Sequence, residues 1–219
     1  NSPCHLDDGV IWSRRLIPNR WQYRDVTGGW HDACDVRKWM SATIMGVIGL
    51  ANVKRLLNPP WDRDNNIFEE IRWGNQYFLK MQDDAGYLYD YCGGDDGNYF
   101  TDNIIGTLDD RRIHVDRADF ITQHNFMVAQ ALIYQLYKDI DPPYAENCLQ
   151  AAMRCYDYCT AHMGPKSIDE IGVALYAGVE LYKATREERF MSFAIEKAEK
   201  LMELQVKEFM GKQTDIKGF

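Results

Sequence analysis

A short string occurs twice in this sequence, as Leu136-Tyr-Lys and, 45 residues later, as Leu181-Tyr-Lys. In both places it ends a segment whose apolar residues recur at three- and four-residue steps, and a turn with an aromatic residue (Tyr144 or Phe190) follows. Apolar spacing of this kind predicts helices. A repeat of about 45 residues built from helix pairs predicts stacked helical hairpins.

The same helical spacing begins at Val36 and continues along most of the chain. Asn58-Pro-Pro stops the first helical segment, and Asn66 with Glu69 has the spacing of a capping box at the start of the second. No alternation typical of a strand extends over a useful length, so the predicted fold class is all-α. Six helices in three hairpins are expected, over residues 36–57, 66–82, 122–138, 143–163, 167–185 and 187–209.

Two segments lack the helical spacing. Residues 1–35 have no sustained period and contain Pro3, Pro18 and a Gly-Gly pair at Gly28, which predicts an extended N-terminal loop before the helical region 36–219. Residues 83–120 are rich in Gly, Asp, Asn and Tyr. A structureless loop of that length is unusual unless it is functional.

Composition excludes several classes of protein. The 219 residues are 46% hydrophobic and carry a net charge of −8, as expected for a globular chain and unfavourable for nucleic acid as a partner. The most apolar stretch, residues 40–53, is interrupted by polar residues and glycines, so we expect no transmembrane segment. Of the six cysteines, Cys148, Cys155 and Cys159 share one helical face, where buried thiols are a better interpretation than disulfides.

The segment with the most chemistry reads Asp25-Val-Thr-Gly-Gly-Trp-His-Asp-Ala-Cys-Asp-Val-Arg-Lys-Trp39. Two adjacent glycines allow positive φ angles and a close approach of the backbone to a ligand. Asp32 and Asp35 stand three residues apart just before a helix, and two nearby carboxylates can orient and deprotonate a water molecule. Alternatively, Asp35 caps the helix that begins at Val36. The two roles are compatible, because a capping carboxylate is fixed in place.

This segment resembles the N-terminal signature of the family 9 glycoside hydrolases, the endoglucanase-type cellulases. The shared pattern is Asp25-x-x-Gly-Gly-Trp-x-Asp-Ala-x-Asp35, continued by Lys38 and Trp39, and Cys34 departs from the usual glycine. Residues 67–82, 101–111 and 174–185 also resemble family segments, in family order.

The resemblance implies a toroid of six helical hairpins, of which about three are present, so the chain looks like the first half of a catalytic domain. It implies an inverting hydrolase of β-1,4-linked glucan or a related β-glycan, with Asp35 as general base and Asp32 holding the water. The general acid, a glutamate, is expected beyond Phe219, and none of the glutamates Glu69, Glu70, Glu170 and Glu180 matches it. Two alternatives remain: an exo-acting β-glucosidase or β-glucosaminidase, and a non-catalytic carbohydrate-binding toroid.

Cys4, His5 and His31 have side chains that zinc prefers, although their spacing alone is nonspecific. Some family members with an N-terminal immunoglobulin-like domain hold a structural zinc with a similar ligand set, completed by a cysteine further upstream. The resemblance therefore implies a structural zinc whose fourth ligand precedes Asn1, and no cofactor for catalysis. It also implies an upstream immunoglobulin-like domain, the other half of the toroid downstream, and a secreted, periplasmic or cell-surface location.

Aromatic side chains are candidates for binding sugar rings. Trp30 belongs to the signature, while Tyr89, Tyr91 and Tyr99 fall in segment 83–120, where ordinary loop packing is the alternative. The oxygen-rich set Asp95, Asp96, Asn98 and Asp102 has the chemistry of a calcium site, although a solvated acidic turn explains it better. For the isolated His114, His124 and His162 a structural role is expected.

Overall fold

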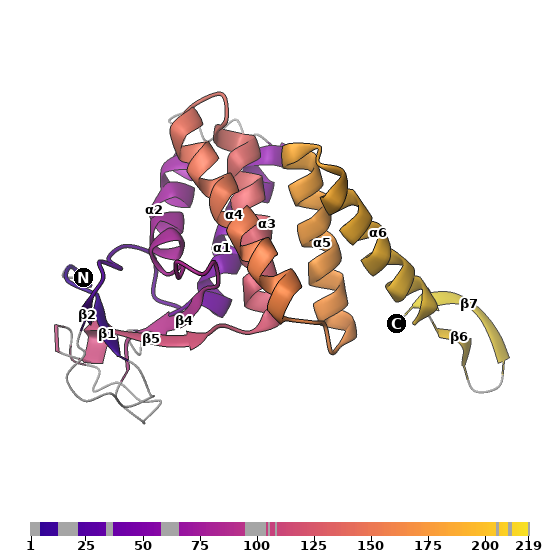
Figure 1. Cartoon of the computed structure of the whole chain (residues 1–219), viewed down its shortest axis with the longest axis horizontal. Helices are drawn as coiled ribbons and strands as arrows, with labels where there is room; N and C mark the ends of the chain where they lie inside the picture. The colour runs from indigo at the N-terminus through magenta and orange to yellow at the C-terminus, as the bar shows by residue number, and fades with distance from the viewer. Residues whose placement is uncertain are drawn as a thin grey trace.

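In the described part of the chain, six helices form where apolar residues recur at helical spacing (Figure 1). Side-chain caps fix the start of several of them. In the computed structural model, residues 5–12, 22–33, 37–57, 66–94, 104, 106–107, 109–204, 206–209 and 212–218 are described. The Asp119 carboxylate accepts from the Thr122 amide at 2.7 Å and the Ser167 hydroxyl from the Glu170 amide at 3.2 Å, each satisfying an otherwise unpaired helical N–H. The helices are α1 (Met40–Leu57), α2 (Asn66–Lys80), α3 (Phe120–Tyr137), α4 (Pro142–His162), α5 (Ile168–Thr185) and α6 (Glu188–Glu203).

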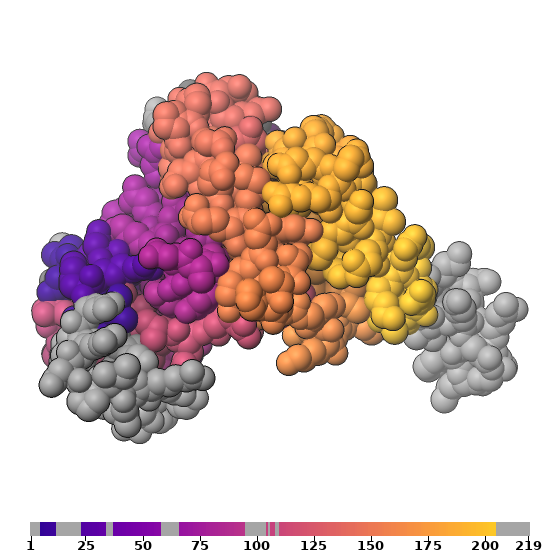
Figure 2. Space-filling view, viewed as in Figure 1, coloured from indigo at the N-terminus to yellow at the C-terminus, as the bar shows by residue number. Residues whose placement is uncertain are grey.

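The helices form a double row. α3 packs against both α1 and α5, while α2, α4 and α6 each pack on the helix that precedes them in the chain. In the space-filling view the segments at the N-terminal end lie on one side of α4 and α5, and α6 lies on the other (Figure 2). The row is therefore open, and the prediction of an all-α fold built from three hairpins is confirmed.

A small sheet accompanies the helices, and the sequence did not predict it. Its strands run in the order β2-β1-β5-β4-β3, with β1 parallel to β5 and the other pairs antiparallel. Part of the N-terminal segment and of segment 83–120, both expected to be loop, is thus paired strand. The strands are β1 (Val10–Trp12), β2 (Gln22–Tyr23), β3 (Lys38–Trp39), β4 (Tyr89–Cys92) and β5 (Arg112–Arg117).

Strands also explain two shifted helix boundaries. α1 begins at Met40 rather than at Val36, because Lys38–Trp39 pairs with β4. α6 ends at Glu203 rather than near residue 209, because Val206–Phe209 (β6) pairs with Lys212–Gly218 (β7).

Helix α1 is the one helix in the described part of the chain that is long and apolar enough to cross a membrane by length and composition. Its face with Ile44, Val47 and Ala51 is fully buried, and the helix packs against α2 and α3. That packing is typical of a core helix. The absence of a transmembrane segment stays a prediction.

The cysteines that the structure describes are buried free thiols, as expected: Cys92, Cys148, Cys155 and Cys159. Burial raises the pKa of Cys148 to about 12, so its thiol is protonated and unreactive at neutral pH. Cys4 and Cys34 lie outside the described residues.

Candidate active site

The glycine pair of the signature lies flat against helix α2. Gly28 and Gly29 have φ angles of 91° and 78°, and a Cβ on Gly29 would come within 2.8 Å of the Tyr77 side chain. The indole nitrogen of Trp73 donates to the Gly29 carbonyl at 3.0 Å. Because any other side chain at position 29 would meet Tyr77, Gly29 serves a close approach between the signature segment and the helix, whereas Gly28 is required by its positive φ.

Asp32 is held at the start of α1. Its carboxylate accepts from the Trp39 amide at 3.3 Å, and its own amide donates to the Arg37 carbonyl at 3.4 Å. The side chain remains exposed, so a solvent molecule can reach it. The other predicted catalytic residue, Asp35, lies outside the described residues, and its role stays a prediction.

Trp30 packs between the first two helices. Its indole ring lies over Gly74 of α2 and Gly46 of α1, where added Cβ atoms would come within 2.2 Å and 3.3 Å of the ring. The indole nitrogen donates to the Glu70 carboxylate at 2.6 Å. This half-buried position serves the packing of α1 on α2, and sugar binding by Trp30 stays a prediction.

The aromatic residues of β4 are buried, which agrees with the packing alternative. Tyr89 is 6% exposed and its hydroxyl donates to the Asp83 carboxylate at 2.5 Å. Tyr91 is 4% exposed and stacks between Trp39 and His114, with ring centroids 3.9 Å apart on both sides. Strand pairing turns both rings inward, and sugar binding by Tyr89 and Tyr91 stays a prediction. The third residue of this group, Tyr99, lies outside the described residues.

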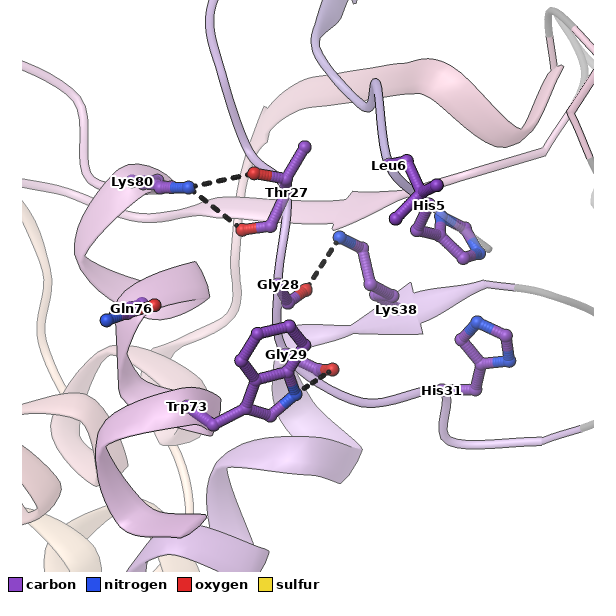
Figure 3. A pocket seen from close by; sticks show the side chains of 10 residues that line it. All are labelled: His5, Leu6, Thr27, Gly28, Gly29, His31, Lys38, Trp73, Gln76 and Lys80. Carbon is purple, nitrogen blue, oxygen red and sulfur yellow. Dashed lines mark hydrogen bonds between the residues drawn. The ribbon is translucent and has the colours of Figure 1, made fainter. Parts of the chain in front are cut away.

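An open pocket of about 460 Å³ lies beside the signature segment (Figure 3). Helix α2 contributes Trp73, Gln76 and Lys80 on one side, and His5 and His31 stand on the other. The backbone of the glycine pair runs between the two sides. The pocket therefore connects the N-terminal residues with the segment that carries Asp32.

His5 and His31, two of the predicted zinc ligands, are neighbours, with ring centroids 4.6 Å apart. His5 Nδ1 is 2.7 Å from the Asp8 carboxylate, whereas its Nε2 is buried and has no hydrogen-bond partner. Burial, together with the nearby His5 and Lys38, lowers the pKa of His31, which favours the neutral imidazole that metals bind. A carboxylate behind one ring nitrogen with the other nitrogen open is typical of a metal-binding histidine, so the residues fit zinc.

The structure does not contain a complete ligand set. Within the described ranges, no group of three or more His, Cys, Asp or Glu side chains is close enough to hold a metal ion. The third predicted ligand, Cys4, lies outside those ranges, as do the four residues of the predicted calcium site, Asp95, Asp96, Asn98 and Asp102.

Two charged residues next to this site, Asp8 and Lys38, are buried, which the sequence did not indicate. Lys38 is 1% exposed and Asp8 is fully buried. For Lys38 the sequence offered one indication of importance, its match to the signature. Nothing in the sequence around Asp8 distinguishes it from a surface residue.

Comparisons with known proteins agree with the fold and the signature. The cellodextrinase of Butyrivibrio fibrisolvens is 23% identical over 230 residues, covering 93% of this chain and 41% of that protein. A crystal structure of a glycoside hydrolase family 9 endoglucanase superposes with a TM-score of 0.73 at 19% identity, covering 97% of this chain and 45% of that one. A cellulase of C. cellulolyticum in complex with cellobiose superposes with a TM-score of 0.66 at 23% identity, covering 89% and 46%.

This chain thus spans less than half the length of the proteins to which it is similar. The sequence profile of glycosyl hydrolase family 9 matches residues 1–216, which is nearly the whole chain. The chain belongs to glycosyl hydrolase family 9.

Proposed function

We propose that the protein containing this chain is an inverting glycoside hydrolase that cleaves β-1,4-linked glucan or a related β-glycan. The observation that carries the proposal is the Asp32 carboxylate, exposed and held by the Trp39 amide just before α1. Asp32 stands three residues before Asp35 in a signature whose departure from the family pattern is Cys34. A cellodextrinase and a cellobiose-bound cellulase among the similar proteins support a β-glucan as substrate.

In the proposed reaction, Asp35 takes a proton from a water molecule that Asp32 helps to orient. The water oxygen attacks the anomeric carbon on one face of the sugar, while a glutamic acid outside these 219 residues protonates the glycosidic oxygen as its bond to that carbon breaks. Inverting enzymes keep the two carboxyl groups about 6.5–9.5 Å apart to leave room for the water. A polymeric substrate of this kind also favours action outside the cytoplasm.

The stereochemistry of the first product tests this proposal. A full-length protein that contains this chain should hydrolyse soluble β-glucan, and proton NMR during the first minutes should show the α-anomer before mutarotation. Initial appearance of the β-anomer would contradict inversion. Binding of the glucan without release of reducing ends would instead favour the non-catalytic alternative.

We also propose that Cys4, His5 and His31, with a fourth ligand upstream of Asn1, hold a structural zinc ion. Two observations support this site: His5 Nε2 is buried without a hydrogen-bond partner, and the His31 ring lies next to it. The zinc ion would cross-link the N-terminal segment to the signature segment. It would take no part in the hydrolysis. Asp8 would orient the His5 ring through Nδ1.

Elemental analysis of the full-length protein tests the metal site directly. We expect about one zinc ion per chain, with removal by a chelator lowering the melting temperature by several degrees, because a ligand bound only to the folded state stabilises it. His31→Ala should abolish both the bound zinc and the effect of the chelator. His162→Ala, at an exposed histidine on α4 that bonds only to its own helix, is the matched control. Absence of zinc from the wild-type protein would overturn the proposal.

A further inference from the structure

Lys38 is a fully buried lysine whose ammonium group has a partner for every proton. Its Nζ lies 2.6 Å from the Asp8 carboxylate and donates to the carbonyl oxygens of Val26 at 2.8 Å and Gly28 at 3.0 Å. A lysine ammonium has three N–H donors, so these contacts use all of them. Figure 3 shows the side chain reaching from β3 to the backbone of the glycine pair.

The two ends of Lys38 are both fixed. At the main chain, its carbonyl oxygen accepts from the Tyr77 hydroxyl at 2.6 Å. At the side chain, the Tyr77 ring lies 4.3 Å from Nζ. The main chain of Asp8 is anchored because its carbonyl accepts from the Val26 amide at 3.1 Å, and its carboxylate also contacts His5 Nδ1 at 2.7 Å. Lys38 thus has little freedom to move relative to α2 or to the N-terminal segment.

These contacts close the base of a loop. Gly28 and Lys38 are joined at 3.0 Å, and the chain between them carries Asp32 and Asp35, the two proposed catalytic aspartates. Within that loop the Asp32 amide bonds to Arg37, and the Asp32 carboxylate bonds to Trp39, on either side of Lys38. These contacts therefore fix the position of Asp32 relative to the backbone on both sides of Lys38.

We propose that Asp8 and Lys38 form a positioning pair that sets Asp32 for attack by water, an inference that rests on the proposed function. A buried ion pair contributes little net stability compared with apolar residues of similar size, so stability alone does not explain its presence. A methionine could fill the volume of Lys38 but would leave the carbonyls of Val26 and Gly28 without a donor. Lys38 is thus a positioning residue and does not touch the substrate.

Kinetics of Lys38→Met in the full-length protein test this role. We expect kcat on soluble β-glucan to fall by about 100-fold, since a misplacement of roughly 1 Å has this cost, while KM changes by less than about threefold. Lys38→Arg, which retains the charge and donors, should recover part of the loss. Lys54→Met is the matched control and should retain kcat, because Lys54 is a second buried lysine that lies on α1, outside the loop.

A second variant keeps the test decisive where Lys38→Met does not fold. Tyr77→Phe removes the hydroxyl that holds the Lys38 carbonyl, and Tyr137→Phe removes a comparable hydroxyl that bonds to the Phe68 carbonyl elsewhere. Hydrogen exchange should increase in peptides covering residues 26–40 for Tyr77→Phe and leave them unchanged for Tyr137→Phe.

The outcomes separate this inference from the proposed function. An active wild type whose folded Lys38→Met variant keeps its kcat would overturn the positioning role, as would exchange that rises equally in α5 and in residues 26–40. A wild type without hydrolytic activity would refute the proposed function, and the exchange measurement would still decide whether the pair holds the loop.

Discussion

Asp35→Asn in a full-length protein that contains this chain should lower kcat on soluble β-glucan by about 10²–10⁴-fold, the usual contribution of a general base, with little change in KM. The amide keeps the shape of the side chain but cannot accept the proton of the attacking water. Substrate binding does not depend on that proton, so the loss should be confined to the chemical step. Steady-state kinetics with a reducing-sugar assay measures both constants.

Asp25 offers a control within the same signature. A hydrogen bond from the Thr27 hydroxyl, followed by the contact with Lys80, lowers the pKa of Asp25 to about 2, so it is ionised but already engaged in structural contacts. Asp25→Asn should therefore leave kcat within a few-fold of the wild type. Equal losses for Asp25→Asn and Asp35→Asn would show that the segment tolerates no change, and full activity of Asp35→Asn would remove Asp35 from the role of base.

The helical part of the fold could be predicted from the sequence because each helix carries its own signal. Apolar spacing, capping residues and prolines lie within the helix or next to it, and the 45-residue repeat shows how the pairs stack. The sheet carries no such signal. Its strand β1 pairs with β5, about 100 residues away, through segments of three to six residues that are too short to show alternation.

The candidate site was predictable to the extent that it lies in one continuous signature. The sequence indicated Asp32, and the contact with Trp39 agrees with a fixed carboxylate. The burial of Lys38 and Asp8 could not be predicted, because charged residues are by default exposed and their pairing joins distant segments. The inward orientation of Tyr89 and Tyr91 likewise depends on the pairing of β4 with its neighbours.

The repeat has a further consequence at the C-terminal ends of α1, α3 and α5, the inner row of helices, in which α3 packs against both others. Gln135 and Glu180 occupy equivalent positions, one residue before each repeated string, and they meet: Gln135 Nε2 donates to Glu180 Oε2 at 3.0 Å. The same oxygen accepts from Arg55 of α1 at 2.9 Å, and Glu180 Oε1 accepts from Lys183 at 2.9 Å. Glu180, which is 1% exposed, thus ties α1, α3 and α5 together.

Glu180→Gln should lower the free energy of unfolding at pH 7 by about 1.5–3 kcal/mol, the range for hydrogen bonds to a charged group. The loss should fall short of that for an orphaned buried charge, because Arg55 and Lys183 keep partial contact with solvent. Burial alone would raise the pKa of Glu180, but the hydrogen bonds from Gln135, Lys183 and Arg55 outweigh it and lower the pKa. Urea unfolding measures the difference.

The lowered pKa fixes the sign of the pH dependence. A carboxylate with a lower pKa in the folded state contributes its full stability above the unfolded pKa of about 4.3 and loses it as the pH falls through the folded pKa. The difference between wild type and Glu180→Gln should therefore be constant from pH 7 to 5 and shrink below pH 4. Glu196→Gln, at an exposed glutamate that pairs with Lys197 on α6, should change stability by less than about 1 kcal/mol at every pH. A difference for Glu180→Gln that grows on acidification would mean that the buried carboxylate strains the inner row of helices instead of joining it.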